Sequence, residues 1–296
     1  MNFEELTTFL TLCEVKNFTQ TAEKLSMSQP TVSLHIKNLE NEFQTKLFHR
    51  SSKKQSITPT GEILYERAKQ IMQIYERTKQ QIAAHHHTIQ GELKIGASYT
   101  IGEYILPMIL AQLKKQHSNL TLQIHIGNTK EIVNYVKLLQ VDIGLIEGTT
   151  NDKELRVTPF MEDELFIVCS PTHRLARMKS VSISDLQNEE WIIRETGSGT
   201  GEYLHHVLNQ HGLKVRSLTT ISSTQGIKES VIHNLGISLL SKNTIKRELQ
   251  LDILHKIPLQ NEQFIRTFSS VYSPIMEERL NVQALLNELS AMEKEI

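Results

Sequence analysis

This sequence has few cysteines, no long apolar run and no excess of charge of either sign. Its two cysteines, Cys13 and Cys169, are too few for a disulfide framework and indicate a reducing compartment. No apolar stretch approaches the ~20 residues that a membrane span needs. The first residues include Glu4 and Glu5 and lack the basic start and apolar run of a signal peptide. We therefore expect a cytoplasmic protein with no membrane partner.

The charge balance is nearly neutral, with 32 Lys and Arg against 33 Asp and Glu. That balance excludes a histone-like basic protein. It leaves room for a small nucleic-acid site, because a local basic patch can exist under a net charge of −1. Hydrophobic residues make up 39% of the 296 residues, which favours two or three globular domains with cores of their own.

The hydrophobic pattern changes near residue 90. Before it the apolar spacing is helical, except for a short hairpin predicted over 47–57. After it we predict strands over 92–98, 120–126, 142–146, 164–169, 191–194, 219–223, 236–240 and 267–272. Helical patterns lie between many of them, over 101–116, 129–139, 200–211 and 224–234. Alternating strands and helices predict βαβ units and a mostly parallel sheet.

The N-terminal segment contains two short helices joined by a tight turn. The second of them starts after Ser28, which can cap it, and carries Pro30 in its first turn, where proline is tolerated. One face of this helix is apolar and the other is polar, as major-groove readout requires. The hairpin that follows has a basic tip suited to phosphates. A small helical bundle with solvated polar faces is the alternative at this point.

Six motifs lie between residues 3 and 61. They are Leu6-x-x-Phe9, Phe18-Thr19-x-x-Ala22-x-x-Leu25, Ser28-Gln29-Pro30-x-Val32-Ser33, Ile36-x-x-Leu39-Glu40, Leu47-Phe48-x-Arg50 and Thr58-Pro59-x-Gly61. At this spacing they resemble the winged helix–turn–helix of LysR-type transcriptional regulators. The resemblance implies an α/β protein with an N-terminal winged helix–turn–helix, joined by a long linker helix to a two-lobed effector module like a periplasmic binding protein. It also implies promoter DNA as a partner, bound by a homodimer or homotetramer, and RNA polymerase as a further candidate.

The resemblance assigns DNA contacts position by position. The residues expected to face the major groove are Gln29, Thr31, Ser33 and Lys37, and those expected on phosphate are Arg50, Lys53 and Lys54. Glutamine can read adenine, and threonine can offer its methyl group to thymine. Each residue alone could be a solvated helix residue. The chain departs from the family at Leu34 and His35, where many members have a longer polar or basic pair.

A long helix is predicted from Thr58-Pro59, a capping hydroxyl followed by proline, to about residue 86. Its residues Leu64, Ala68, Ile71, Tyr75, Thr78 and Ile82 recur at intervals of four and three, which is the period of a coiled-coil seam. We expect this seam to pair with a second copy, and packing on the protein's own body is the alternative. The tract His85-His86-His87 is expected to be a solvated helix end, because consecutive helical residues point apart.

Hydroxyl-rich turns open several helices just after a strand. The effector-binding residues expected there are Ser98, Thr100, Thr129, Ser198, Gly199, Thr200 and Thr224. Helix-start N–H groups bind small anions, and ligands of α/β sheets lie at the carboxyl ends of strands. The alternative is that these hydroxyls only cap their helices.

The family resemblance implies a ligand site between two lobes. The domains expected are the winged helix–turn–helix 1–58, the linker 59–90 and the effector module 91–296, with lobe one at 91–161 and 267–296 and lobe two at 162–266. The stretch Glu195–Thr200 resembles the branch of the family that governs sulfur or carbon assimilation. That branch continues with arginine, whereas this chain has Gly201-Glu202, which favours a singly anionic effector, one from sulfur, cysteine or related assimilation.

Two other functions fit the sequence less well. An enzyme is disfavoured, because the glycine-rich loop 197–201 lacks the Lys and Ser/Thr of a P-loop and no G-x-S-x-G, H-E-x-x-H or C-x-x-C occurs. A two-lobed solute-binding protein without gene regulation is opposed by the N-terminal segment. We expect no catalytic residues, no metal and no cofactor.

Overall fold

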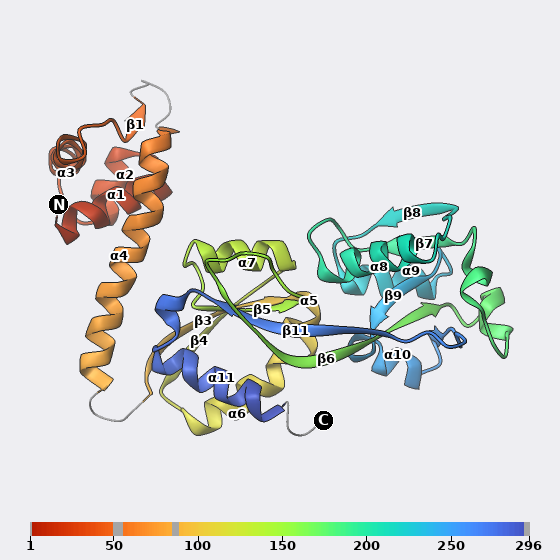
Figure 1. Ribbon diagram of the computed structural model, residues 1–296. Coiled ribbons are helices and arrows are strands. Elements are labelled where there is room, and N and C mark those ends of the chain that lie inside the picture. The colour runs from red at the N-terminus through yellow and green to blue at the C-terminus, as the bar shows by residue number, and fades with distance from the viewer. Residues whose placement is uncertain (1, 50–55, 85–88, 293–296) are drawn as a thin grey trace. The chain divides into compact units, whose positions relative to one another are not determined.

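The computed structural model describes residues 2–49, 56–84 and 89–292, and the chain forms two compact units, 1–87 and 88–296 (Figure 1). The elements of the first unit are α1 (Phe3–Val15), α2 (Phe18–Lys24), α3 (Gln29–Glu42), β1 (Phe48–His49), β2 (Ser56–Ile57) and α4 (Pro59–Ala84). Each of the first three helices starts at a polar cap, namely Asn2, Asn17 and Ser28. The predicted capping by Ser28 is confirmed, since its side chain accepts from the Thr31 N–H.

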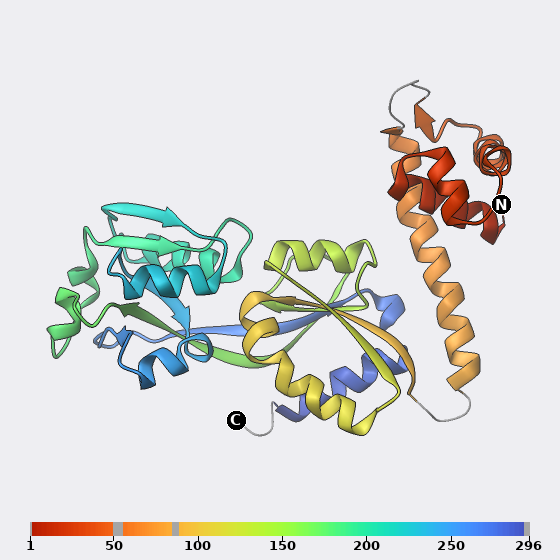
Figure 2. The same ribbon diagram turned by 180° about the vertical axis from the view of Figure 1, so that it is seen from behind.

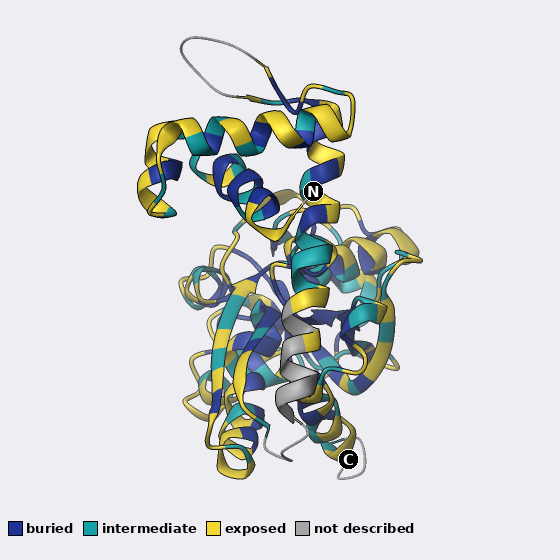
Figure 3. Cartoon of the chain, turned by 90° about the vertical axis from the view of Figure 1, so that its left-hand side faces the viewer, coloured by how far each residue is buried: buried dark blue, intermediate teal, exposed yellow. Residues whose placement is uncertain are grey.

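The core of this unit is apolar, and its main cluster of buried residues comes from α1, α3, α4 and residues 47–48. These are Leu6, Phe9, Leu12, Ile36, Leu39, Leu47, Phe48, Leu64 and Ala68. Figure 3 shows buried and exposed residues alternating along the helices, as amphipathic helices around one core require. The prediction of a hairpin over 47–57 is confirmed at its base, where Phe48 pairs with Ile57 and His49 with Ser56.

The predicted seam of the linker helix is wrong in its first half. Leu64 and Ala68 are buried in the core of the same unit, where α4 packs on α1. Tyr75 stacks on Phe3, with ring centroids 4.2 Å apart. The heptad spacing in this half arises because one face of α4 packs on the N-terminal core. This was the alternative, packing on the protein's own body. For Ile82 the structure describes the backbone alone.

The second unit contains the remaining elements. They are β3 (Gly91–Ser98), α5 (Tyr99–Tyr104), α6 (Leu106–Gln116), β4 (Leu120–Gly127), α7 (Thr129–Lys137), β5 (Ile143–Glu147), β6 (Arg156–Cys169), β7 (Glu190–Ile193), α8 (Gly199–Gln210), β8 (Ser217–Thr220), α9 (Thr224–Ile232), β9 (Ser238–Ser241), α10 (Lys246–Gln250), β10 (His255–Lys256), β11 (Phe264–Tyr272) and α11 (Leu280–Met292). Short 3₁₀ helices lie at Arg174–Arg177, Ile183–Leu186, Lys242–Thr244 and Pro274–Met276.

The main sheet has seven strands, ordered β10-β6-β11-β5-β3-β4, with β9 also paired to β6. Among the described strands of this sheet, the parallel pairs are β3 with β4 and β3 with β5, whereas β11 is antiparallel to both β5 and β6. The prediction of a mostly parallel sheet is therefore wrong. The sheet is mixed because β6 and β11 are two long strands that run side by side in opposite directions through the unit (Figures 1 and 2).

Those two strands join two lobes with separate cores. Lobe one is built around β3, β4, β5, α6 and α11, with Leu106, Ile109 and Leu285 among its buried residues. Lobe two is built around β7, β8, α8 and α9, and Trp191 is its largest buried side chain. The two-lobed α/β fold that was predicted is thus observed.

Two further differences concern helices. The helix predicted over 101–116 is two helices, because Pro107 lacks an N–H and the backbone turns at Ile105. The C-terminal helix α11 was not predicted, although Val282, Leu285 and Leu289 are buried at helical spacing. No helix within 2–49, 56–84 or 89–292 is long and apolar enough to cross a membrane.

Candidate functional site

The exposed side of α3 carries the predicted base-reading residues. Gln29, Ser33 and Lys37 follow one another at intervals of four and line a shallow groove of about 410 Å³, to which Phe18 and Phe48 also contribute. The Gln29 amide donates to the Ser33 hydroxyl at 3.2 Å, which aligns both side chains along the helix. Three of the four predicted groove residues therefore share one stripe.

Thr31 lies apart from that stripe. It lines a different hollow, of about 500 Å³, together with Met27, His35 and Tyr75, and its hydroxyl lies 2.7 Å from that of Ser28. His35 Nδ1 lies 2.8 Å from the hydroxyl of Thr8, so His35 positions α3 on α1. Between the two sides Leu34 points outward, with 54% of its surface exposed.

The start of the wing is held by specific contacts. Glu40 binds Lys46 Nζ at 2.5 Å and the N–H of Leu47 at 3.1 Å. Thr58 caps α4 by accepting from Gly61 N at 3.0 Å, and a Cβ at Gly61 would lie 2.4 Å from the Leu47 carbonyl oxygen, so only glycine fits. The wing therefore emerges from a fixed base. The predicted phosphate contacts Arg50, Lys53 and Lys54 lie outside the described residues.

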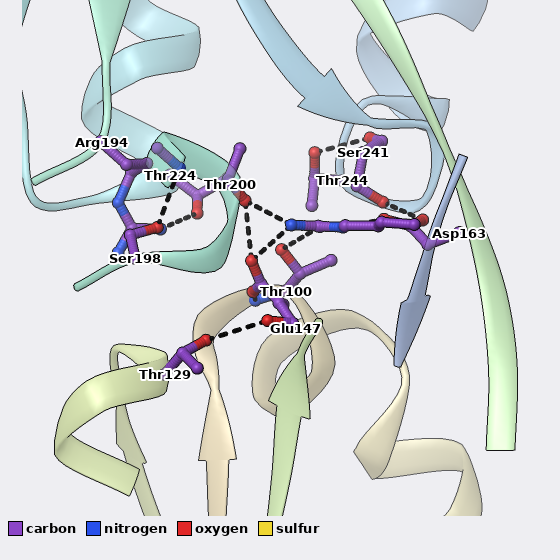
Figure 4. A network of polar contacts seen from close by, with 12 residues as sticks. Thr100, Thr129, Glu147, Asp163, Arg194, Ser198, Thr200, Thr224, Ser241 and Thr244 are labelled. Atoms are coloured by element: carbon purple, nitrogen blue, oxygen red, sulfur yellow. Dashed lines mark hydrogen bonds and ion pairs between the residues drawn. The ribbon is translucent and has the colours of Figure 1, made fainter. Parts of the chain in front are cut away.

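In the second unit, the predicted turns of both lobes meet at the ends of β3 and β5. Thr100 of lobe one and Thr200 of lobe two lie on opposite sides of one buried carboxylate, that of Glu147 (Figure 4). The Thr100 N–H donates to Glu147 Oε1 at 3.0 Å, and the Thr200 hydroxyl donates to Oε2 at 2.7 Å. The Thr129 hydroxyl donates to the Glu147 carbonyl oxygen at 3.4 Å. The sequence thus predicted the turns but missed the group at their centre.

Two other charged residues that sequence reasoning missed complete the network. Arg266 of β11 donates through Nη1 to Glu147 Oε2 at 2.6 Å and through Nε to Asp163 Oδ2 at 2.9 Å. Asp163 of β6 also accepts from Ser241 at 2.6 Å and from Asn243 at 3.0 Å. All three charged side chains are at most 3% exposed.

The electrostatics of the two carboxylates differ. Burial by itself raises the pKa of Glu147, but the attraction of Arg266 and the hydrogen bonds from Thr200 and Thr100 outweigh it and lower that pKa to about 2. Burial raises the pKa of Asp163, and its contacts with Arg266, Ser241 and Asn243 offset this only in part. Glu147 is therefore the firmly ionised member of the pair.

The other predicted effector residues have separate roles. Ser198 caps α8, with its hydroxyl 3.5 Å from Gly201 N. Thr224 accepts from Arg194 Nη1 at 3.3 Å and does not touch Glu147. Ser98 stands at the start of α5, 1% exposed, and its hydroxyl has no hydrogen-bond partner among the described residues. Capping thus accounts for Ser198 and leaves Ser98 unexplained.

Gly199 is explained by close packing between the lobes. A Cβ there would lie 2.4 Å from the Glu147 carbonyl oxygen and 2.7 Å from its Cβ. Only glycine lets the first turn of α8 approach the end of β5. Two members of the network carry a signal in the sequence, because Glu147 and Arg266 are the single charged residues of their strands.

Metal binding has no support in the part of the chain that the structure describes, where no group of three or more His, Cys, Asp or Glu could hold an ion. The tract His85–His87 lies outside that part. Arg194, buried at the end of β7, stacks on Tyr99 at 4.5 Å and pairs with Glu195. These contacts explain its burial without a ligand.

Comparison with known proteins covers both units. Residues 3–62 match the model of the bacterial regulatory helix-turn-helix protein, lysR family, and residues 86–293 match the LysR substrate binding domain. The HTH-type transcriptional regulator CysL of Bacillus subtilis is 53% identical over 98% of this chain and 97% of its own. These matches overturn the alternatives of a plain helical bundle and of a solute-binding protein without gene regulation.

Solved structures share the fold. A full-length OxyR variant of Pseudomonas aeruginosa has a TM-score of 0.77 at 21% identity, covering 98% of this chain and 94% of that one. Full-length CbnR in complex with its target DNA has a TM-score of 0.69 at 15% identity, covering 99% and 100%. With its helix–turn–helix and its two-lobed module, this chain belongs to the LysR family of bacterial transcriptional regulators.

Proposed function

We propose that this regulator reads the bases of promoter DNA with four residues of α3, Gln29, Thr31, Ser33 and Lys37. The DNA phosphates are contacted by three residues of the wing, Arg50, Lys53 and Lys54. The domains assigned to these roles are the winged helix–turn–helix 1–58, the linker 59–90 and the effector module 91–296. The protein acts in the cytoplasm as a homodimer or homotetramer and catalyses no reaction. The observation that carries the DNA assignment is the exposed stripe Gln29–Ser33–Lys37 on a firmly capped helix.

The effector is a small, singly anionic metabolite, bound between lobe one (91–161 and 267–296) and lobe two (162–266). Sulfur, cysteine or related assimilation is the pathway that the Glu195–Thr200 stretch favours, and a relative named CysL supports it. The observation behind the site is the meeting of helix starts from both lobes around Thr100 and Thr200. The unpartnered hydroxyl of Ser98 is a further donor there.

Lobe closure links the two functions. Thr100 lies in lobe one and Thr200 in lobe two, so a ligand that contacts both changes how the lobes meet. The long strands β6 and β11 run through both lobes and carry the change along the module. A ligand can shift this equilibrium only by its differential affinity for the two arrangements.

The DNA assignment is tested by fluorescence anisotropy on a promoter fragment found by genome-wide binding. Gln29→Ala should lower affinity for the native site and leave affinity for unrelated DNA unchanged, because the amide reads bases and not phosphate. Gln44→Ala, at an exposed glutamine beyond the end of α3, is the matched control. Equal loss on both kinds of DNA would show that Gln29 does not read sequence.

A further inference from the structure

Glu147 is surrounded as a bound ligand would be. Its carboxylate lies at the start of α5, where the Thr100 N–H donates to Oε1 at 3.0 Å. On the other oxygen it receives the Thr200 hydroxyl at 2.7 Å and Arg266 Nη1 at 2.6 Å. The donors come from three elements in two lobes, and Figure 4 shows the two threonines converging on this one group.

These donors match a carboxylate in number and kind. A backbone N–H at a helix start, a hydroxyl and a guanidinium are groups that bind anions in proteins. The guanidinium is fixed independently of Glu147, because its Nε is bound to Asp163, and Asp163 is held by Ser241 and Asn243. The receptor therefore keeps its shape when the Glu147 side chain leaves it.

We propose that Thr100, Thr200 and Arg266 form a carboxylate-binding site whose resident ligand, in the absence of effector, is the chain's own Glu147. This inference rests on the proposed function and deepens it: the effector carries a carboxylate and enters by displacing that of Glu147. The exchange leaves Arg266 paired with one carboxylate before and after. The low pKa of Glu147 agrees with a site built for an anion.

The exchange has a mechanical consequence for the lobes. Glu147 is covalently part of β5 in lobe one, and it binds Thr200 at the start of α8 in lobe two. While Glu147 occupies the site, the carboxylate ties the two lobes together. A free carboxylate fills the same donors without that covalent link. Gly199 permits the tie, because any side chain there would push α8 away from Glu147.

The test removes the resident carboxylate and supplies a free one. Full-length Glu147→Ala is titrated with sodium acetate and sodium formate at pH 7, with chloride at equal ionic strength as the reference, and the unfolding midpoint is followed. Acetate should raise the midpoint of Glu147→Ala by about 3–6 °C at ten times Kd, and above Kd the midpoint should keep rising with the logarithm of the acetate concentration. The wild type should respond to acetate no more than to chloride, because its site is filled.

Three variants make the result specific. Glu147→Gln keeps the volume filled and should show no acetate response. Glu189→Ala is the matched control, a buried carboxylate paired with Arg174 outside this site, and should also show none. Glu147→Asp withdraws the carboxylate by one methylene and keeps the charge, so it carries the test if Glu147→Ala does not fold. In it formate, which is smaller than acetate, should raise the midpoint.

An absent response in both Glu147→Ala and Glu147→Asp would overturn the proposal, as would an equal response in Glu189→Ala. Failure of the proposed function gives a different pattern. Acetate rescue together with no metabolite effect on DNA binding would uphold the carboxylate site and refute the effector assignment. A metabolite effect on DNA binding, with no rise in the unfolding midpoint of Glu147→Ala in acetate, would uphold the effector assignment and refute the carboxylate site.

Discussion

At the scale of single residues, the buried charge of Glu147 couples folding to pH. Its pKa is about 2 in the folded protein against an ordinary value of 4.5, so folding favours its ionised form. The contribution to stability is complete above pH 4.5 and is lost as the pH falls through about 2. The shift in the pKa of Glu147 corresponds to roughly 3 kcal/mol of stability.

Glu147→Gln should therefore be less stable than the wild type at neutral pH, and the gap should shrink with acidity. Urea unfolding at pH 7, 5, 4 and 3 measures this gap. It should be constant between pH 7 and 5 and decrease below 4.5, because only the unfolded wild type takes up a proton there. A gap that stays constant down to pH 3 would show that Glu147 is not held by its charge.

Both cysteine thiols are expected to react slowly with thiol reagents in the folded protein. Burial raises the pKa of Cys13 and of Cys169 to about 12, and the thiolate is the reactive form. In the folded protein at pH 8, the two thiols should react with an aromatic disulfide reagent about a thousandfold more slowly than free cysteine. Unfolding in urea should restore the full rate. Fast labelling of either thiol in the native state would contradict the burial of these side chains.

Leu34 is exposed on α3 where the family commonly has a polar residue. An apolar side chain there can contact the methyl group of thymine. Replacing thymine by uracil across the half-site should weaken wild-type binding by about fourfold per contacted methyl group. Leu34→Ala should lose this sensitivity, whereas Ser33→Ala should retain it. Equal uracil sensitivity in the Leu34→Ala variant and the wild type would place the methyl contact elsewhere.

At the scale of elements, α4 has one buried and one exposed apolar face. Leu64 and Ala68 complete the N-terminal core, whereas Ile63 and Ile74 are 63% and 47% exposed. Leu64→Ala should lower the stability of this core by about 2–5 kcal/mol. We propose that this exposed side of α4 is the contact between copies, so Ile74→Lys should leave that stability unchanged and weaken the oligomer by placing a charge in the contact.

Thermal unfolding and sedimentation velocity separate the two effects on α4. The oligomer of Ile74→Lys should dissociate at higher protein concentration than that of the wild type. The unfolding midpoint of the N-terminal core should stay unchanged. If Ile74→Lys sediments like the wild type, the exposed side of α4 is not the contact between copies.

The elements themselves were largely predictable, because helices and strands follow hydrophobic periodicity. The first half of β6 was missed, since Glu162, Asp163 and Glu164 interrupt its apolar pattern. Asp163 is buried only because Arg266 lies beside it, 103 residues away in the chain. Local patterns carry no information about such a partner. The same reason explains why the turns of the candidate site were found and the charges that join them were not.

At the scale of the whole molecule, the assignment requires that a small ligand in one unit changes DNA binding by the other. Linkage makes this effect reciprocal: a ligand that alters DNA affinity has its own affinity altered by DNA to the same degree. Substitution of Ser98 can weaken ligand binding without removing a bond within the protein, because its buried hydroxyl makes no hydrogen bond to the described residues. Ser98→Ala therefore removes no bond that the structure records.

The most direct measurement is the affinity of full-length protein for its promoter fragment with and without metabolites of sulfur and amino-acid assimilation that carry one carboxylate. We predict that one of them changes wild-type DNA affinity, and that Ser98→Ala binds this metabolite five- to a hundredfold more weakly, the equivalent of about 1–3 kcal/mol, with DNA binding alone unchanged. If no metabolite alters DNA affinity, or Ser98→Ala binds it as tightly as the wild type, the effector site does not lie between these lobes.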